Sequence, residues 1–261
     1  NISRENCTWP VILLSLVILS APAALSQQKV KLLSSDFVEG GKKGGNKYNK
    51  VRGNVHFIQG TTEIFCDSAF FYKKQNSIEA YGHIKIFDMQ DSTTIRSDKL
   101  TYSGNTKFAQ LRENVVYQDD SILLYTNFLD YNVVDKSAQY FNNGKIINGQ
   151  NVLTSITGYY DTRGKKMSFY NNVVLDNPQN TVKSDTLLYN MITEVARTYG
   201  PSTIISSDGT TVFSEKGGEF MMRSKQTTIE SGTIETESYI LKGRKLYYDQ
   251  MNHTNRAEGN I

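Results

Sequence analysis

The chain has 261 residues, which is enough to bury a substantial hydrophobic core. Lysine and arginine total 29 against 26 aspartates and glutamates, and this near balance without a polycationic tract argues against a nucleic acid as the partner. Sixteen tyrosines, twelve phenylalanines, nineteen glycines and only four prolines form a composition that is typical of β-structure.

The first 26 residues differ from everything that follows. A polar lead containing Arg4 precedes the apolar run Val11–Leu19, and small residues follow it. This order is typical of a secretory signal peptide spanning residues 1–26, with cleavage expected after Ser26. A run of nine residues, eight of them apolar, is too short to cross a bilayer of about 30 Å, which disfavours a membrane anchor. We therefore expect an exported protein that is soluble or peripheral to a membrane.

Residues 27–50 are expected to be a flexible N-terminal lead-in, because Gly40–Lys50 is rich in glycine and lysine. The two cysteines are Cys7, inside the signal peptide, and Cys66, so no internal disulfide is expected. Cys66 occupies the slot that Ser97 holds in a later repeat, which favours a small buried residue over a nucleophile.

A short pattern then recurs with a period of about 30 residues, as in tandem repeat proteins. It begins at Gly53-Asn54-Val55. The later copies are Gly82-His83-Ile84, Glu113-Asn114-Val115, Gly144-Lys145-Ile146, Asn171-Asn172-Val173, Ser202-Thr203-Ile204, Gly232-Thr233-Ile234 and Gly259-Asn260-Ile261. A second landmark keeps the same period, since SDKLTY at 97–102 is repeated as SDTLLY at 184–189. We predict one β-repeat domain over residues 51–261, and we expect it to continue in a longer protein.

Each unit reads as two strands and two turns. Apolar and polar residues alternate at Ile84, Lys85 and Ile86, which is the period of a half-buried strand. The chain is therefore predicted to be all-β, with about fourteen to sixteen strands. The alternation breaks between Ser97 and Leu100, and a β-bulge near Asp98-Lys99 would return both side chains to one face.

The inward-facing positions are candidates for an apolar groove, because stacked units would align them into ladders along the long axis. They are Ile78, Ala80, Ile84, Ile95, Leu100, Tyr102, Ala109, Leu111, Val115, Met167, Phe169, Val173 and Leu188. The small members leave room for a guest molecule, or they only balance large residues across a packed core.

The motifs GNV at 53–55, SDKLTYSGNTKFAQLRENV at 97–115 and SDTLLYN at 184–190 resemble the OstA-type domain. This is the family of the lipopolysaccharide-transport protein LptA and of the periplasmic part of LptD. The resemblance implies an antiparallel, V-shaped β-jelly-roll whose apolar interior accepts the acyl chains of lipid A. It also implies that the protein is located in the periplasm, where it can associate with the outer membrane. The implied partners are lipopolysaccharide and either other Lpt-type transport proteins or further copies of the chain, head to tail.

Basic residues near the mouth of such a groove are Lys73, Lys74, Lys99 and Arg112. They are candidates for contact with lipid phosphates, or they protect strand edges as solvated charges.

Two other classes of function were compared with lipid transport. A structural or adhesive surface β-solenoid without lipid cargo is the main alternative, although a parallel solenoid has three short strands per coil. An enzyme is not expected, because His56, His83 and His253 lack the spacing of a zinc site, and Asp119-Asp120 falls at a predicted turn. No catalytic residue, metal or cofactor is predicted.

Overall fold

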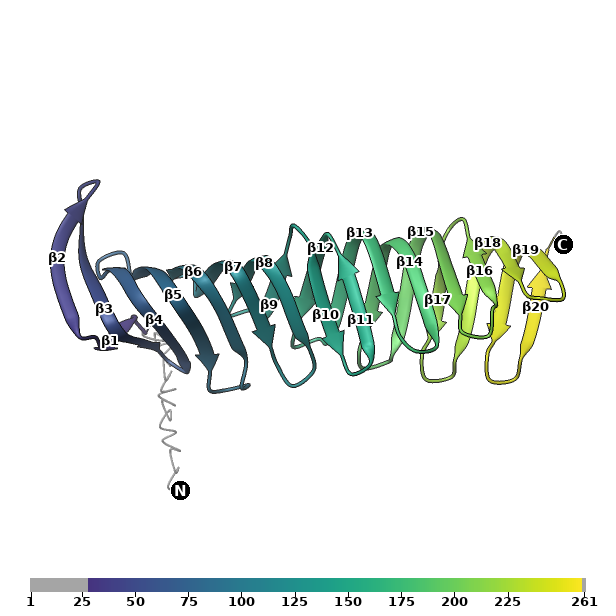
Figure 1. Cartoon of the computed structure of the whole chain (residues 1–261), viewed down its shortest axis with the longest axis horizontal. Helices are drawn as coiled ribbons and strands as arrows, with labels where there is room; N and C mark the ends of the chain where they lie inside the picture. The colour runs from purple at the N-terminus through teal and green to yellow at the C-terminus, as the bar shows by residue number, and fades with distance from the viewer. Residues whose placement is uncertain (1–27, 260–261) are drawn as a thin grey trace, which may run out of the picture.

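The computed structural model describes residues 28–259; the predicted signal peptide with Cys7, and the end of the last repeat start at 260–261, lie outside the described residues. The molecule is elongated, and its strands lie across the long axis and follow one another in chain order (Figure 1). The strands are β1 (Lys31–Ser34), β2 (Phe37–Lys43), β3 (Asn46–Gln59), β4 (Thr62–Tyr72), β5 (Ser77–Asp88), β6 (Thr94–Ser103), β7 (Phe108–Gln118), β8 (Leu123–Asn132), β9 (Ser137–Tyr140), β10 (Gly144–Asn148), β11 (Asn151–Ser155), β12 (Thr157–Asp161), β13 (Lys166–Asp176), β14 (Asn180–Asn190), β15 (Val195–Ser206), β16 (Thr211–Ser214), β17 (Gly218–Met221), β18 (Gln226–Glu235), β19 (Ile240–Asp249) and β20 (Thr254–Glu258). The described part of the chain contains no helix that could cross a membrane.

The strands pair with their chain neighbours, and every pairing between residues 28 and 259 is antiparallel. Four pairs of short strands, β1 with β2, β9 with β10, β11 with β12 and β16 with β17, are each one long strand interrupted in its middle. With each pair counted once, sixteen long strands remain. The all-β, antiparallel fold class is confirmed.

Each long strand turns a corner in its middle. In β5, Gly82 and His83 have φ angles of 75° and 41°, in the left-handed region. The pairing of β5 with β6 shifts register beside these two residues, and Asp98 of β6 stands opposite them. The register shift predicted near Asp98-Lys99 is therefore confirmed, although the residues with positive φ lie on the neighbouring strands. Left-handed residues cost about 1–2 kcal/mol unless they are glycine or asparagine, which accounts for the recurring Gly-Asn spelling.

The aspartate of the recurring SDKLTY motif binds the bent residue in the corner of the next strand. The Nδ2 atom of Asn114 donates a hydrogen bond to Asp98 at 2.6 Å. One repeat earlier, the Nδ1 atom of His83 lies 2.8 Å from a carboxylate oxygen of Asp67. The motif that contains Asp98 thus recurs because its aspartate binds the left-handed residue at the corner of the neighbouring strand.

Three corners fall earlier than the sequence pattern places them. Asn142 and Asn143 carry the positive φ angles, so Gly144 occupies the position that Val55 has in the first unit. Likewise Gly200 and Ser231 are the left-handed residues of their units. The predicted starts at 144, 202 and 232 are therefore two residues late, because they were aligned on glycine and isoleucine and not on the pair of residues that must bend.

The corners fold the sheet into two layers that face each other. Layer A contains the strand halves such as residues 84–88 of β5, and layer B contains the halves such as residues 77–81. Rings meet across the two layers: Phe57 of layer A lies 5.3 Å from Phe71 of layer B, centroid to centroid. The two layers join at the corners. At the opposite side each layer ends in hairpin turns, and we call the turns of layer A lip A and those of layer B lip B. The result is the V-shaped jelly-roll that the resemblance implied.

Residues 31–50, for which the composition predicts a flexible lead-in, instead form β1, β2 and the start of β3. β1 pairs with the second half of β3, and β2 pairs with its first half. The β2–β3 hairpin stands at the N-terminal end of the molecule (Figure 1). The glycines of Gly40–Lys50 that suggested a linker serve a strand and a tight turn.

Candidate functional site

The interior between the layers is filled by side chains in the N-terminal part. Tyr102, Tyr117 and Tyr131 are almost fully buried, and the rings of Tyr117 and Tyr131 lie 6.0 Å apart. The hydroxyl of Tyr102 donates to Oε1 of Gln59 at 2.7 Å. The amide of Gln59 in turn donates to the carbonyl oxygen of Gly104 at 2.7 Å, which joins lip A to lip B. Buried rings and hydrogen-bonded amides thus fill this part of the interior.

Tyr140 ends the filled part. Its ring lies against Gly144 and Gly158, where a Cβ atom would approach the ring to 2.4 and 2.3 Å. Its hydroxyl hydrogen-bonds Oγ of Ser155 at 2.5 Å. The two glycines are required by this close approach of the tyrosine ring between them.

Beyond Tyr140 the layers enclose a cavity of about 580 Å³. Apolar side chains form its walls: Ile146, Leu153, Met167, Phe169, Leu175, Val182, Leu187, Tyr189, Met191, Ile204, Phe220, Met221, Met222 and Tyr248. Its rim at the lips is polar and consists of Asn148, Gln150, Asn151, Asn177, Gln179, Asn180, Glu194, Lys225, Gln226, Thr227 and Gln250. The volume lies within the range of about 300–1,000 Å³ of small-molecule sites. An apolar interior beneath an amide-rich rim suits an amphiphile.

Two features of the walls favour an adaptable binding space. Along layer A, the inward ladder after Tyr117 continues with aliphatic residues such as Leu124, Ile146 and Leu153. Four of the six methionines of the chain lie at the cavity. Methionine is unbranched and flexible, so it can fit guests of irregular shape.

Twelve of the thirteen groove candidates from the sequence are buried, whereas Leu188 is only partly buried. Leu188 pairs with Ser168 and Arg197 on the outer side of layer B, and the inward residue is Leu187. Leu187 aligns with Leu100 when the SDKLTY and SDTLLY motifs are superposed at their serines. The sequence therefore already indicated that Leu187 is the inward residue. The role of Leu188 as a groove residue is corrected on this ground.

Of the predicted residues, only Met167 and Phe169 line the cavity, and the other buried ones belong to the packed interior or to walls outside it. The sequence missed Leu187, Ile204 and Phe220. The last two lie within the segment 200–235, whose repeat pattern is the weakest. The interior is thus hollow in one part and filled in another, and not open along its whole length.

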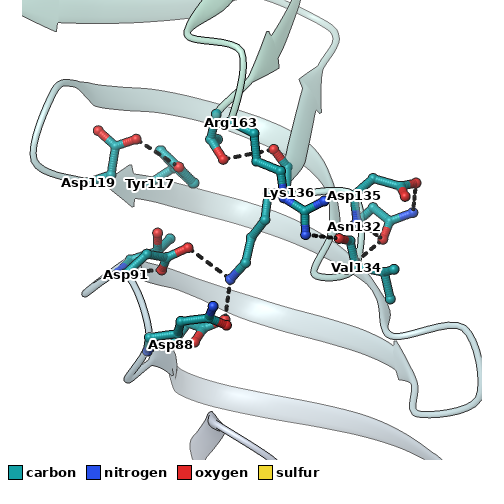
Figure 2. Close-up of polar contacts among 12 residues, drawn as sticks. Asp88, Asp91, Tyr117, Asp119, Asn132, Val134, Asp135, Lys136 and Arg163 are labelled. Atoms are coloured by element: carbon teal, nitrogen blue, oxygen red, sulfur yellow. Dashed lines mark hydrogen bonds and ion pairs between the residues drawn. The ribbon is translucent and has the colours of Figure 1, made fainter. Parts of the chain in front are cut away.

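A buried ion pair joins the lips on the filled side. The ammonium of Lys136 in lip B lies 2.5 Å from Asp88 and 2.8 Å from Asp91 in lip A, as Figure 2 shows. The side chains of Lys136 and Asp88 are 9% and 3% exposed. Burial lowers the pKa of Lys136, but hydrogen bonds to Asp88 and Asp91 outweigh it and raise that pKa above its usual value. Lys136 therefore stays charged between its two partners.

The next lysine of lip B also contacts lip A, and we call this row of contacts between the lips the seam. Lys165 Nζ lies 3.0 Å from Oγ of Ser121 and 3.2 Å from the hydroxyl of Tyr160. A polar pocket of about 340 Å³ lies between the two lysines, and acidic and basic side chains such as Asp119 and Arg163 alternate around it. Asp119 also accepts hydrogen bonds from two backbone N–H groups of its turn, which agrees with its prediction as a turn former.

The other residues considered for chemistry are engaged in structural contacts. Cys66 is buried, and this burial raises the pKa of its thiol to about 12. Lys99 pairs with Glu113 at the exposed corner, and Arg112 pairs with Asp130 on the outer face. No cluster of His, Cys, Asp and Glu within residues 28–259 has the arrangement of a metal site.

Comparison with known proteins adds one finding to this geometry. A model of the family described as OstA-like protein matches residues 27–185, which is more than half of the chain. The matched range contains the filled interior and the first walls of the cavity. The chain matches no curated protein.

Proposed function

The chain belongs to the OstA-like family, and from this premise we propose that it is a periplasmic lipopolysaccharide-binding and transport protein that carries acyl chains in its apolar cavity toward the outer membrane. The cavity of about 580 Å³ beyond Tyr140 is the observation that carries the proposal. The OstA-like family is a lipid-transport family, and the proposal assigns no catalytic role to any residue.

The physical chemistry of the cavity supports a lipid guest. Removing a twelve-carbon acyl chain from water is worth on the order of 10 kcal/mol, at about 0.8 kcal/mol per methylene. The cavity holds roughly twenty groups of the size of a water molecule, at about 30 Å³ each, so one such chain fits. An exposed ion pair contributes only about 0–1 kcal/mol, so apolar burial dominates the affinity.

Transport in this proposal is passive. The lipid enters between the lips above Leu187 and Phe220, and its polar part stays at the amide-rich rim. An energy source elsewhere supplies direction. The predicted signal peptide of residues 1–26 would deliver the protein to the periplasm, where other Lpt-type proteins or further copies of the chain would receive the lipid.

One observation favours a second function for part of the chain. The interior before Tyr140 is closed by aromatic rings and by the buried Lys136 pair, so that part suits a scaffold or a spacer. The antiparallel pairing of the strands disfavours a parallel surface solenoid. The scaffold function is therefore the alternative if no lipid binds.

Photo-crosslinking tests the proposal by comparing two positions in the cavity wall with two positions outside the cavity. A photoreactive amino acid at Met191 or Met222, both partly buried in the cavity wall, should form adducts with lipopolysaccharide. The same amino acid at Leu188, which faces outward, and at Lys107, in a lip without a cavity, should form none. Equal adduct yields at all four positions, or no adducts at any of them, would contradict the proposal.

A further inference from the structure

The two lips form parallel series of equivalent residues. In lip B, the last turn residue before the strand has a positive φ in each repeat. Asn76 is the first of them, and Lys107, Lys136, Lys165, Glu194, Lys225 and His253 follow in the later repeats. In lip A, the corresponding residue lies at the end of a layer A strand or directly after it: Gln59, Asp88, Asp119, Asn148, Asn177 and Ser206 in the corresponding repeats. Because the strands stack with a constant offset, each member of one series has a fixed counterpart in the other.

The counterpart is known from the contacts on the filled side. Lys136 binds Asp88, which precedes it by 48 residues. Asn177 precedes Lys225 by the same interval, and both line the rim of the cavity. At this place lip A presents a neutral amide where the earlier repeat presents a carboxylate. The facing residue of lip A thus decides whether a lysine of lip B finds an acid. Lys136 finds one, whereas Lys225, like Lys107 opposite Gln59, does not, and of these Lys225 is the one that stands at the cavity.

Lys225 is left without an acidic partner. It is exposed, and no ion pair or hydrogen bond of its side chain is found among the described residues. The nearest acidic member of the rim, Glu194, is bound by the guanidinium of Arg223 at 2.9 Å. A cation at the rim of an apolar cavity, faced by amides that can also donate hydrogen bonds, is suited to an anion attached to a hydrocarbon chain.

We propose that Lys225 binds the anionic head group of an amphiphile whose acyl chain lies in the cavity beneath it. The proposal rests on the lipid-binding function and adds the chemical class of the head group and its position. Asn177 and Asn180, on the facing lip, would donate amide hydrogen bonds to the same group. The contacts that Lys136 and Lys165 make across the lips would then mark the closed side, and the head group would sit only above the open part.

The turn at Asn177 allows a specific test. The Oδ1 atom of Asn177 accepts hydrogen bonds from the backbone N–H groups of Gln179 and Asn180 at 2.9 and 3.0 Å. Asp119 makes the same two bonds in its own turn, at 2.7 and 2.9 Å. The substitution Asn177→Asp should therefore keep the turn intact and supply Lys225 with the carboxylate that Lys136 already has.

The experiment measures binding of dodecyl phosphate, of uncharged dodecyl maltoside and of inorganic phosphate by calorimetry. Lys225→Gln and Asn177→Asp should each weaken binding of dodecyl phosphate about tenfold, the size of one charge-assisted hydrogen bond, and leave dodecyl maltoside unchanged. The control Lys107→Gln changes the equivalent residue of lip B beside the filled part of the interior, and it should alter the affinity for neither amphiphile. Circular dichroism checks that each variant is folded.

The other outcomes separate the two proposals. If both amphiphiles bind and Lys225→Gln alters neither affinity, the head-group inference is overturned while the lipid cavity stands. If inorganic phosphate binds as tightly as dodecyl phosphate, Lys225 belongs to a site for free anions and the inference is overturned as well. If neither amphiphile binds the unmodified protein, the lipid-binding function itself is refuted.

Discussion

The buried lysine of the seam gives the sharpest prediction on stability. Lys136→Met keeps most of the length of the side chain but leaves Asp88 and Asp91 without their cation. Removing one partner of a buried ion pair costs about 3–5 kcal/mol, because the remaining charge stays desolvated. Since Asp91 is 35% exposed and can regain water, we expect a value near the lower end, about 3 kcal/mol.

Urea unfolding followed by circular dichroism measures this loss, and two further variants make the reasoning testable. Adding Asp88→Asn and Asp91→Asn to Lys136→Met should restore most of the stability, because no buried charge then remains unpaired. Lys99→Met, which breaks an exposed pair, should change the unfolding midpoint little. If Lys136→Met also changes the midpoint little, or if the two asparagines restore nothing, the seam is not a buried electrostatic contact.

The same pair determines how the stability depends on pH. The pKa of Asp91 is lowered: burial raises it, but hydrogen bonds from Lys136 and Thr93 outweigh that effect. Its contribution is therefore complete above about pH 4 and is lost as the pH falls through the folded-state pKa. The pKa of Lys136 is raised, so its contribution is lost only above about pH 10. We expect unfolding midpoints that are constant from about pH 5 to 9 and that drop in acid less steeply for Lys136→Met.

Three further changes probe the corners and the core. Gly82→Ala forces a side chain onto a φ of 75° and should cost about 1–2 kcal/mol in urea unfolding, whereas Gly40→Ala, with open space around it, should cost much less; equal losses would refute the role of the corner. Tyr102→Phe removes the donor to Gln59 and should cost about 1–3 kcal/mol by the same assay; a neutral result would mean that water replaces the hydroxyl. Cys66, whose thiol pKa is raised to about 12, should react with a thiol reagent at pH 8 only as fast as the protein unfolds, and rapid labelling of the folded protein would contradict its burial.

The strand content, the antiparallel layers and most inward residues could be predicted from the sequence because they depend on local rules. Alternation identified Ile84 and Ile95, and the broken alternation located the register shift at Asp98. The same rules misplaced the corner at Gly144 and the inward leucine at Leu188. At Leu188 a misalignment of one residue reverses the face of the strand. At Gly144 the shift is two residues, which keeps the face but misplaces the corner, because only the backbone decides which residues bend.

The position of the cavity could not be predicted in the same way. It depends on contacts between residues about one and a half repeats apart, such as the ring of Tyr117 against that of Tyr160 at 6.3 Å. Whether two facing ladders fill the interior is decided by the summed volume of side chains from different strands. The same holds for the lips, since Lys136 and Lys225 have the same position in their turns, and the residue on the facing turn decides whether the lysine is paired.

The central claim, that hydrocarbon occupies the cavity beyond Tyr140, is tested most directly by NMR of the methionine methyl groups. Met167, Met191, Met221 and Met222 line the cavity, while Met89 and Met251 are exposed elsewhere. On addition of lipopolysaccharide, the signals of the four cavity methyl groups should shift and those of the two exposed ones should stay in place. Unchanged cavity signals at saturating lipid, or equal shifts at Met89 and Met251, would contradict a lipid bound inside the protein.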